Sequence, residues 1–135
     1  MSYQLHFERL VEYDPGHQGI SLQITLKLGK TSVEVPVKID TGAGGSIFSR
    51  QYGEQLGLVI ENEYRQTFST ATGTFLTFGH FVTLNIAGIE FDTLVYFAAD
   101  DHFNRNVIGR FGGLDHLVMG VVDYEGKLYV RAYNE

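Results

Sequence analysis

The 135-residue chain contains no cysteine. This absence excludes disulfide bonds, thiolate metal sites and a cysteine nucleophile, and it is compatible with a reducing compartment. The chain is also poor in proline, with two residues, whereas it contains 16 glycines, 10 phenylalanines and 8 tyrosines. This composition favours short strands that are joined by turns.

A surplus of positive charge is missing as well. Asp and Glu number 16 against 10 Lys and Arg, which gives a formal net charge of −6. Because binding to a phosphate backbone depends on clustered Lys and Arg, we expect no nucleic acid partner. The first residues lack the basic and apolar regions of a secretory signal, and no apolar run approaches bilayer length. We therefore expect no membrane partner and a cytoplasmic location.

The size of the chain suits one domain. A domain of this length buries roughly two thirds of the surface that its unfolded chain exposes. Apolar residues make up 44% and charged residues 19%, so the composition is neither disordered nor fibrous. We find no internal repeat, linker or low-complexity tract. Residues 1–135 are therefore predicted to form a single domain.

Alternation of apolar and polar residues predicts most of the secondary structure. The clearest strand covers residues 20–28, and a turn at Gly29-Lys30 leads into a second strand over residues 31–39. Ser49 is predicted to cap one short helix that ends at Gly57. Further extended segments are expected at residues 5–13, 46–48, 58–60, 64–68, 75–84, 89–97, 117–122 and 127–133. The predicted fold class is all-β, closed and barrel-like, with one short helix.

The second of these strands ends at a carboxylate. Val35, Val37 and Ile39 alternate with polar or proline positions, and Asp40-Thr41-Gly42-Ala43 follows directly. This arrangement holds one acid in a fixed orientation at the end of a rigid element. Asp-Thr-Gly is equally typical of an ordinary turn, because Asp and Thr bond their own backbone and Gly accepts positive φ. The motif alone leaves both interpretations open.

Other reactive side chains form no recognisable site. The five histidines have no metal-ligand spacing, so we predict surface or loop histidines and no metal site. Ser46 and Ser49 lack a neighbouring His–acid pair and a nucleophile-elbow pattern, which argues against a serine hydrolase. Aromatic residues on the predicted strands are expected in the core or in a cleft wall. These aromatic residues are Phe75, Phe78, Phe81, Phe91, Tyr96 and Phe97.

Three motifs in order give the chain a family resemblance. The Asp40-Thr41-Gly42-Ala43 loop is followed by a hairpin tip of small residues, Thr70-Ala71-Thr72-Gly73, and then by the apolar pair before glycine in Val107-Ile108-Gly109-Arg110. With the strands between them, these motifs resemble retropepsin-like aspartic proteases, and in particular the bacterial and retroelement members. The resemblance spans about residues 20–133.

The resemblance implies a role for each motif. Asp40 would supply the catalytic carboxylate, Thr41 would lock together the two loops of a dimer, and Gly42 would let the backbone approach the reacting groups. The hairpin would be a flap over the substrate, and Val107-Ile108-Gly109 would pass beneath the catalytic loop. The residues implied in substrate binding are Ala43, Gly44, Ala71, Thr72, Gly73 and Ile108.

The chain carries only one Asp-Thr-Gly loop, and it has no room for a second lobe. Aspartic proteases need two carboxylates, so the resemblance implies an obligate homodimer with both Asp40 residues on the two-fold axis. It implies an endopeptidase that acts on a peptide or protein substrate without a cofactor. Two alternatives stay open. One is a catalytically silent peptide-binding or dimerisation module of the same fold, and the other is an unrelated ligand-binding barrel.

Several positions depart from the retroviral pattern. Gly44 stands where retroviral enzymes usually have an Asp that pairs with the Arg of the later motif, so Arg110 needs another partner, and Asp115 is the nearest acid in sequence. Ala43 lacks the hydroxyl that pepsin-like enzymes often carry there, which implies activity at weakly acidic pH. We also expect the C-terminal residues 129–133 to join the dimer interface.

Overall fold

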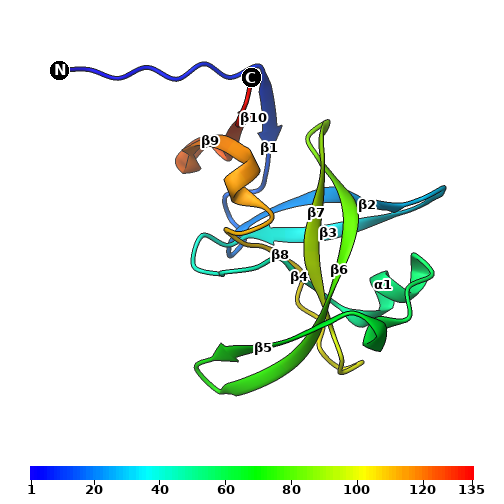
Figure 1. Ribbon diagram of the computed structural model, residues 1–135. Helices are drawn as coiled ribbons and strands as arrows, with labels where there is room; N and C mark the ends of the chain where they lie inside the picture. The colour runs from blue at the N-terminus through cyan, green and yellow to red at the C-terminus, as the bar shows by residue number, and fades with distance from the viewer.

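The computed structural model describes residues 1–135 and consists mainly of β-strands (Figure 1). The strands are β1 (Arg9–Glu12), β2 (Ile20–Leu28), β3 (Thr31–Ile39), β4 (Ile47–Phe48), β5 (Tyr64–Thr70), β6 (Gly73–Ile86), β7 (Ile89–Ala98), β8 (Val107–Ile108), β9 (Leu117–Val122) and β10 (Lys127–Ala132). The helices are α1 (Arg50–Gln55) and three short 3₁₀ turns, η1 (Ile60–Asn62), η2 (Leu114–His116) and η3 (Asp123–Glu125).

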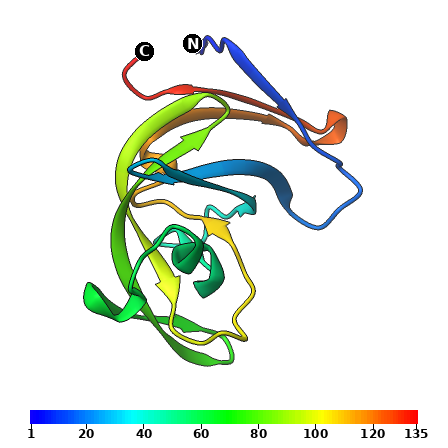
Figure 2. The same ribbon diagram turned by 90° about the vertical axis from the view of Figure 1, so that its right-hand side faces the viewer.

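Seven strands form the larger sheet in the order β2-β3-β8-β4-β7-β6-β5. An additional pairing between β2 and β6 closes the sheet into a ring, and β5 remains outside the ring as an edge strand. Most pairs are antiparallel, but β8 runs parallel to β3 and β7 runs parallel to β4. The predicted all-β, barrel-like fold with one short helix is confirmed. Figure 2 shows the molecule from the side on which the helix α1 lies, with the helix in front of the strands.

The β2–β3 hairpin forms as the alternation predicts. Its register runs from Ile20 opposite Ile39 to Leu28 opposite Thr31. Val35 and Val37 on β3 are 0% and 1% exposed, whereas Pro36 and Lys38, which alternate with them, are exposed. One face of β3 therefore packs into the core, and the other face is available to solvent or to a ligand.

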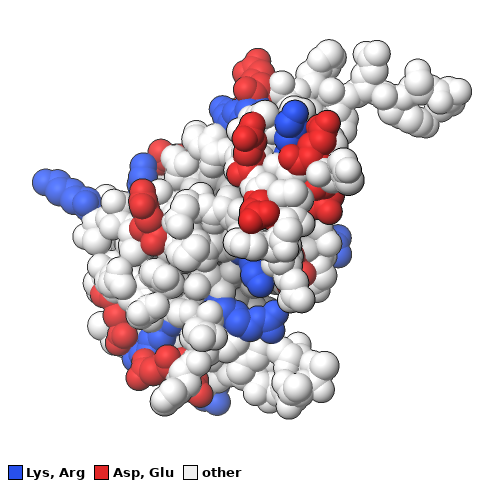
Figure 3. Space-filling model, turned by 180° about the vertical axis from the view of Figure 1, so that it is seen from behind, with Lys and Arg blue, Asp and Glu red and all other residues white.

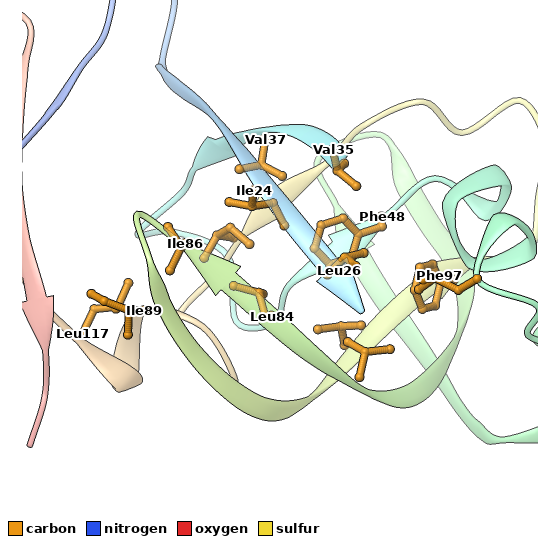
Figure 4. Close-up of a cluster of buried hydrophobic side chains, with 14 of the residues drawn as sticks. Ile24, Leu26, Val35, Val37, Phe48, Leu84, Ile86, Ile89, Phe97 and Leu117 are labelled. Atoms are coloured by element: carbon orange, nitrogen blue, oxygen red, sulfur yellow. The ribbon is translucent and has the colours of Figure 1, made fainter. Parts of the chain in front are cut away.

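The hydrophobic core fills the inside of the ring (Figure 4). Phe48 on β4 and Phe97 on β7 are fully buried, with ring centroids 5.9 Å apart. Ile108 on β8 is 1% exposed and belongs to the same cluster. Each of the two-residue strands β4 and β8 thus contributes a buried side chain. Burial of these strands stabilises their positions in the sheet, because about 25 cal/mol is gained per Å² of apolar surface removed from water.

The three-stranded sheet has the order β1-β10-β9. Because β10 lies in the middle, its backbone pairs on both sides, and the free edges belong to β1 and β9. The C-terminal residues 129–132 therefore have no free strand edge within the single chain, and their place in a dimer interface stays a prediction. Two other boundaries differ from the sequence prediction. The first strand begins only at Arg9, and Ile60 opens a 3₁₀ turn instead of ending a strand.

Arg50, the first residue of α1, ties three segments together. Its guanidinium donates hydrogen bonds to the Glu61 carboxylate, one of them 2.8 Å long, and to the Ala99 carbonyl at 3.1 Å. The hydrogen bond from Arg50 lowers the pKa of the Glu61 carboxyl. Ser49 occupies the N-cap as predicted, but its side chain makes no capping hydrogen bond. The contact with Ala99 fixes the start of the loop that precedes β8.

One of the five histidines is not where we expected it. His80 on β6 is 3% exposed, and its Nε2 lies 2.8 Å from the Ile60 carbonyl oxygen, so the prediction of a surface or loop position is wrong for this residue. A buried polar ring of this kind needs such a partner. No group of three or more His, Asp or Glu side chains comes together in a metal-binding arrangement. The helices are all too short or too polar to span a membrane.

Candidate functional site

Asp40 follows β3 directly and is held by its own turn. Its backbone N–H donates to the Ile108 carbonyl on β8 at 2.9 Å. Its Oδ1 accepts a hydrogen bond from the Gly42 N–H at 2.9 Å, and the Ala43 N–H donates to the Asp40 carbonyl at 3.2 Å. The turn interpretation of Asp-Thr-Gly is therefore correct as local geometry. The turn fixes one carboxylate oxygen, while Oδ2 has no hydrogen-bond partner within the chain.

The backbone of residues 109–111 also forms hydrogen bonds with the Asp40 loop and the residues that follow it. The Arg110 N–H donates to the Ala43 carbonyl and the Phe111 N–H to the Gly44 carbonyl, each at 2.9 Å. The Gly109 N–H donates to the buried Ser46 hydroxyl at 3.2 Å. As expected, the segment that follows β8 passes against the loop. These contacts tie the loop at both ends, so the position of the Asp40 carboxylate depends on β8 as much as on β3.

Gly109 permits this close approach. A Cβ atom at residue 109 would collide with the Gly45 carbonyl oxygen and would lie 2.8 Å from the Ala43 carbonyl oxygen. Both obstacles are backbone atoms, which cannot move without displacing the loop. By contrast, a Cβ atom at Gly44 would meet no atom within 4 Å. Glycine is thus required at 109 by packing and is not required for this reason at 44.

A cavity of about 290 Å³ joins the Asp40 loop to the part of the β5–β6 hairpin next to its tip. Figure 1 also places the turn after β3 and the tip of this hairpin on the same side of the molecule. The lining residues are Asp40, Gly42, Ala43, Gly44, Ile47, Phe68, Ser69, Thr70, Phe75, Phe103, Arg105 and Val107. Three phenylalanines form its apolar wall, and the Asp40 carboxylate and the Arg105 guanidinium are its charged groups.

Two further cavities adjoin the loop. One, of about 370 Å³, lies between Gly44-Gly45 and Phe68 and is also lined by Tyr96 and Phe111. The other, of about 540 Å³, follows the exposed face of β3 as far as Asp40 and is bordered by residues 104–107. Asp40 lines both the 290 Å³ and the 540 Å³ cavity and therefore lies where they meet. On the hairpin side, Phe68 lines both the 290 Å³ and the 370 Å³ cavity and lies between them.

The structure brings together only part of the predicted substrate-binding set. Ala43 and Gly44 line the 290 Å³ cavity with Asp40. Ala71, Thr72 and Gly73 form the exposed tip of the β5–β6 hairpin and line none of the described cavities. The Thr70 hydroxyl fixes this tip by donating to the Gly73 carbonyl at 3.0 Å.

Two expectations for the later motif need correction. The side chain of Ile108 is 1% exposed and packs into the core, so it is not placed to contact a ligand. Arg110 has no carboxylate within ion-pair distance, and its guanidinium lies 5.4 Å from the centroid of the Phe111 ring. Asp115 instead accepts a hydrogen bond from the Gly112 N–H at 3.1 Å. Asp115 is therefore not the partner of Arg110.

Sequence reasoning missed four residues of the cavity wall. Phe68, Ser69, Phe103 and Arg105 line the cavity beside Asp40, although the sequence pattern assigned none of them to the site. The signal was indirect. Because the loop leads into β8, and β8 pairs with β3 in parallel with Val107 beside Lys38, the end of the loop must lie next to β3.

Comparison with known proteins shows a match to one protein family and to solved structures of the same fold. A family model described as "Aspartyl protease" matches residues 24–120. Among solved structures, EIAV protease in complex with the inhibitor HBY-793 matches with a TM-score of 0.58 and 21% sequence identity, over 74% of this chain and 88% of that chain. No curated protein sequence matches the chain significantly. The structural match supports the retropepsin-like fold, and the alternative of an unrelated ligand-binding barrel is wrong.

Replacement of Gly109 tests the clamp on the loop. We expect Gly109→Ala to lower the free energy of unfolding by about 2 kcal/mol or more, because the added methyl group displaces backbone atoms in a packed region. Gly44→Ala is the matched control, since its Cβ atom enters open space. Urea denaturation followed by circular dichroism measures both variants. Equal stability of the two variants would contradict the role of the close approach.

Proposed function

Because the chain belongs to the aspartyl protease family, we propose that it is an endopeptidase whose active site is shared by two copies of the chain. In this proposal the Asp40 carboxylates of both protomers activate one water molecule, which attacks the peptide bond. Thr41 and Gly42 position the two carboxylates. The substrate is a peptide or an unfolded segment of a protein, and no cofactor takes part.

The placement of Asp40 is the observation that carries this proposal. The carboxylate is only partly buried, its Oδ1 is fixed by the Gly42 N–H, and its Oδ2 has no hydrogen-bond partner within the chain. It also lies where two cavities meet. A fixed acid with one unoccupied oxygen beside a cleft suits general acid–base catalysis.

One such carboxylate is not enough for the reaction. Hydrolysis needs one ionised carboxylate to take a proton from water and one protonated carboxyl to donate to the scissile carbonyl oxygen. In aspartic proteases the two acids lie about 3 Å apart, share one proton and titrate as a unit, an established behaviour that we apply here. Since each chain has one Asp-Thr-Gly loop, a homodimer would hold one active site.

An exposed surface next to Asp40 suits the second copy. Thr41 is exposed and borders a cavity of about 360 Å³ together with Phe111 and Met119. The Phe111 side chain is 65% exposed, which is unusual for an aromatic residue so close to a packed loop. Met119 belongs to β9, whose outer edge is unpaired. An exposed aromatic side chain beside a free strand edge favours association, here with the same surface of a partner across a two-fold axis.

The cavities on the hairpin side suit an extended peptide. Phe68 stands between the 290 Å³ and 370 Å³ cavities, and each cavity could take one apolar side chain. β5 is the edge strand of its sheet, so its outer backbone groups are free to pair with an extended chain. On this view the wall residues Phe68, Ser69 and Thr70 contact the substrate together with Ala43 and Gly44. Ala71, Thr72 and Gly73 would reach it only if the hairpin closes.

Replacement of Asp40 tests the catalytic role. We expect Asp40→Asn to abolish peptide cleavage, because the amide can neither accept a proton from water nor share one with a partner carboxylate. The variant keeps the turn, since the amide oxygen still accepts the Gly42 hydrogen bond. Digestion of a peptide library with equal amounts of wild type and variant, analysed by mass spectrometry, measures the effect.

Sedimentation supplies the control for this experiment. The variant should form the same dimer as the wild type, or a firmer one, because the replacement removes repulsion between two like acids. Undiminished cleavage by the variant would overturn the proposal. A wild type that binds peptides as a dimer without cleaving them would leave the silent binding module as the function.

The side chain at residue 43 is expected to affect the pH dependence of peptide cleavage. Without a hydroxyl donor at residue 43, we expect the highest kcat/KM at weakly acidic pH, above the range of strongly acidic enzymes. Ala43→Ser should move the profile roughly 0.5–1 pH unit lower, because a hydrogen bond to the ionised carboxylate favours that form. Initial rates measured across the pH range test both expectations. A wild-type kcat/KM that is highest at about pH 2 would contradict them.

A further inference from the structure

Two basic side chains beside Asp40 have no acidic partner. Most other basic residues are occupied: Arg9, Lys27, Arg50 and Lys127 pair with carboxylates, and Arg131 bonds the carbonyls of the chain end. Lys38 and Arg105 pair with none, although acids outnumber bases 16 to 10. Both line the 540 Å³ cavity, where Asp40 is the only carboxylate. The cavity wall is therefore locally basic in an acidic protein.

Local structure fixes the direction of Lys38. Residues 38 and 40 are two apart at the end of β3, so both side chains leave on the face opposite Val37, about 7 Å apart along the strand. The aliphatic part of Lys38 lies over Gly19, and its Cδ would be 3.2 Å from a Cβ atom there. The stem of Lys38 thus packs along the cavity wall, while its ammonium group is free to bind.

Arg105 belongs to the loop before β8, which borders the same cavity as Lys38. It lines both the 540 Å³ cavity and the 290 Å³ cavity, so it lies where the two meet. The loop that carries it is anchored at the next residue, since the Asn106 carbonyl accepts from the Lys38 N–H at 3.0 Å and its side-chain oxygen accepts from the Ser49 N–H at 2.9 Å. Neither Lys38 nor Arg105 forms an ion pair with Asp40 within 4.0 Å. The two cations therefore remain available to a ligand.

The distribution of charge on the surface agrees with this arrangement. Figure 3 shows basic side chains beside a hollow in the middle of the face, whereas acidic side chains are spread around it. A carboxylate that enters the cavity could accept two parallel hydrogen bonds from a guanidinium and one from an ammonium group. Ser21 and Asn104 add neutral polar groups to the same wall. An apolar side chain would leave both cations without a partner.

We propose that the substrate carries an acidic side chain, Glu or Asp, next to the scissile bond, and that Lys38 and Arg105 bind its carboxylate in the 540 Å³ cavity. This inference rests on the proposed endopeptidase function, because it takes Asp40 as the point of cleavage. It adds a specificity for charge to a cleft whose other two cavities are partly lined by aromatic side chains. The binding is electrostatic and weakens as ionic strength rises.

Matched peptide pools test the specificity. The probes are fluorescent decapeptide pools of random sequence that differ only in having Glu, Gln or Lys fixed at the centre. Glu and Gln have nearly the same shape, so a difference between their pools reports charge. We expect initial cleavage of the Glu pool to be roughly five- to tenfold faster than that of the Gln pool at low salt, with the Lys pool slowest.

Three variants assign the effect to the cavity. Arg105→Gln and Lys38→Gln should each bring the Glu-to-Gln rate ratio toward one, mainly by slowing cleavage of the Glu pool. Lys30→Gln is the matched control. Lys30 is exposed, has no ion pair and lies in the β2–β3 turn at the far end of β3 from Asp40. The control should keep the wild-type ratio.

A binding measurement separates this inference from the proposed function. The Asp40→Asn protein is titrated with each pool, and fluorescence anisotropy reports binding without cleavage. Cleavage that depends on Asp40 but is equal for the Glu and Gln pools would overturn the acidic specificity and leave the endopeptidase intact. Absence of cleavage together with tighter binding of the Glu pool, lost in Arg105→Gln, would overturn the endopeptidase and keep the acidic site. Equal binding and equal or absent cleavage would overturn the acidic site.

Discussion

The parallel pairing of β3 with β8 is the constraint on which the site depends. It sets the Asp40 backbone against Ile108 and leads the following residues back across the loop, where Arg110 and Phe111 bond the carbonyls of Ala43 and Gly44. The approach is possible only because residue 109 has no side chain. Two strands of very different length, one of nine residues and one of two, thus hold a single carboxylate in place.

The same pairing determines what surrounds the carboxylate. It brings the loop before β8 beside the exposed face of β3, so that Arg105 and Lys38 face one cavity. On the other side, Phe68 and Phe75 of the β5–β6 hairpin line the 290 Å³ cavity. Asp40 therefore lies between two basic side chains and the aromatic side chains of the hairpin. With one such loop per chain, we propose that the arrangement is half of an aspartic protease site, which a second copy completes.

Local patterns predicted much of the fold but only part of the site. The alternation in residues 20–28 and 31–39 reports burial of one face directly, so the hairpin and the position of Asp40 at its end followed from it. Ile108 was misjudged, because a two-residue strand has no periodicity to show which way its side chain points. Arg105 and Ser69 were missed, because their proximity to Asp40 depends on pairings between distant segments. Gly44 removed the acid expected beside Arg110, and no local signal showed that an aromatic contact would replace it.

The most direct test of the account is whether one active site needs two Asp40 carboxylates. Wild type and Asp40→Asn are mixed in equal amounts at constant total concentration, and differently tagged copies are used to verify that subunits exchange. If both carboxylates act on one water molecule, only dimers of two wild-type chains are active, and the specific activity falls to about a quarter of that of the wild type alone. A fall to about one half would mean that each chain works independently, and it would contradict the shared site.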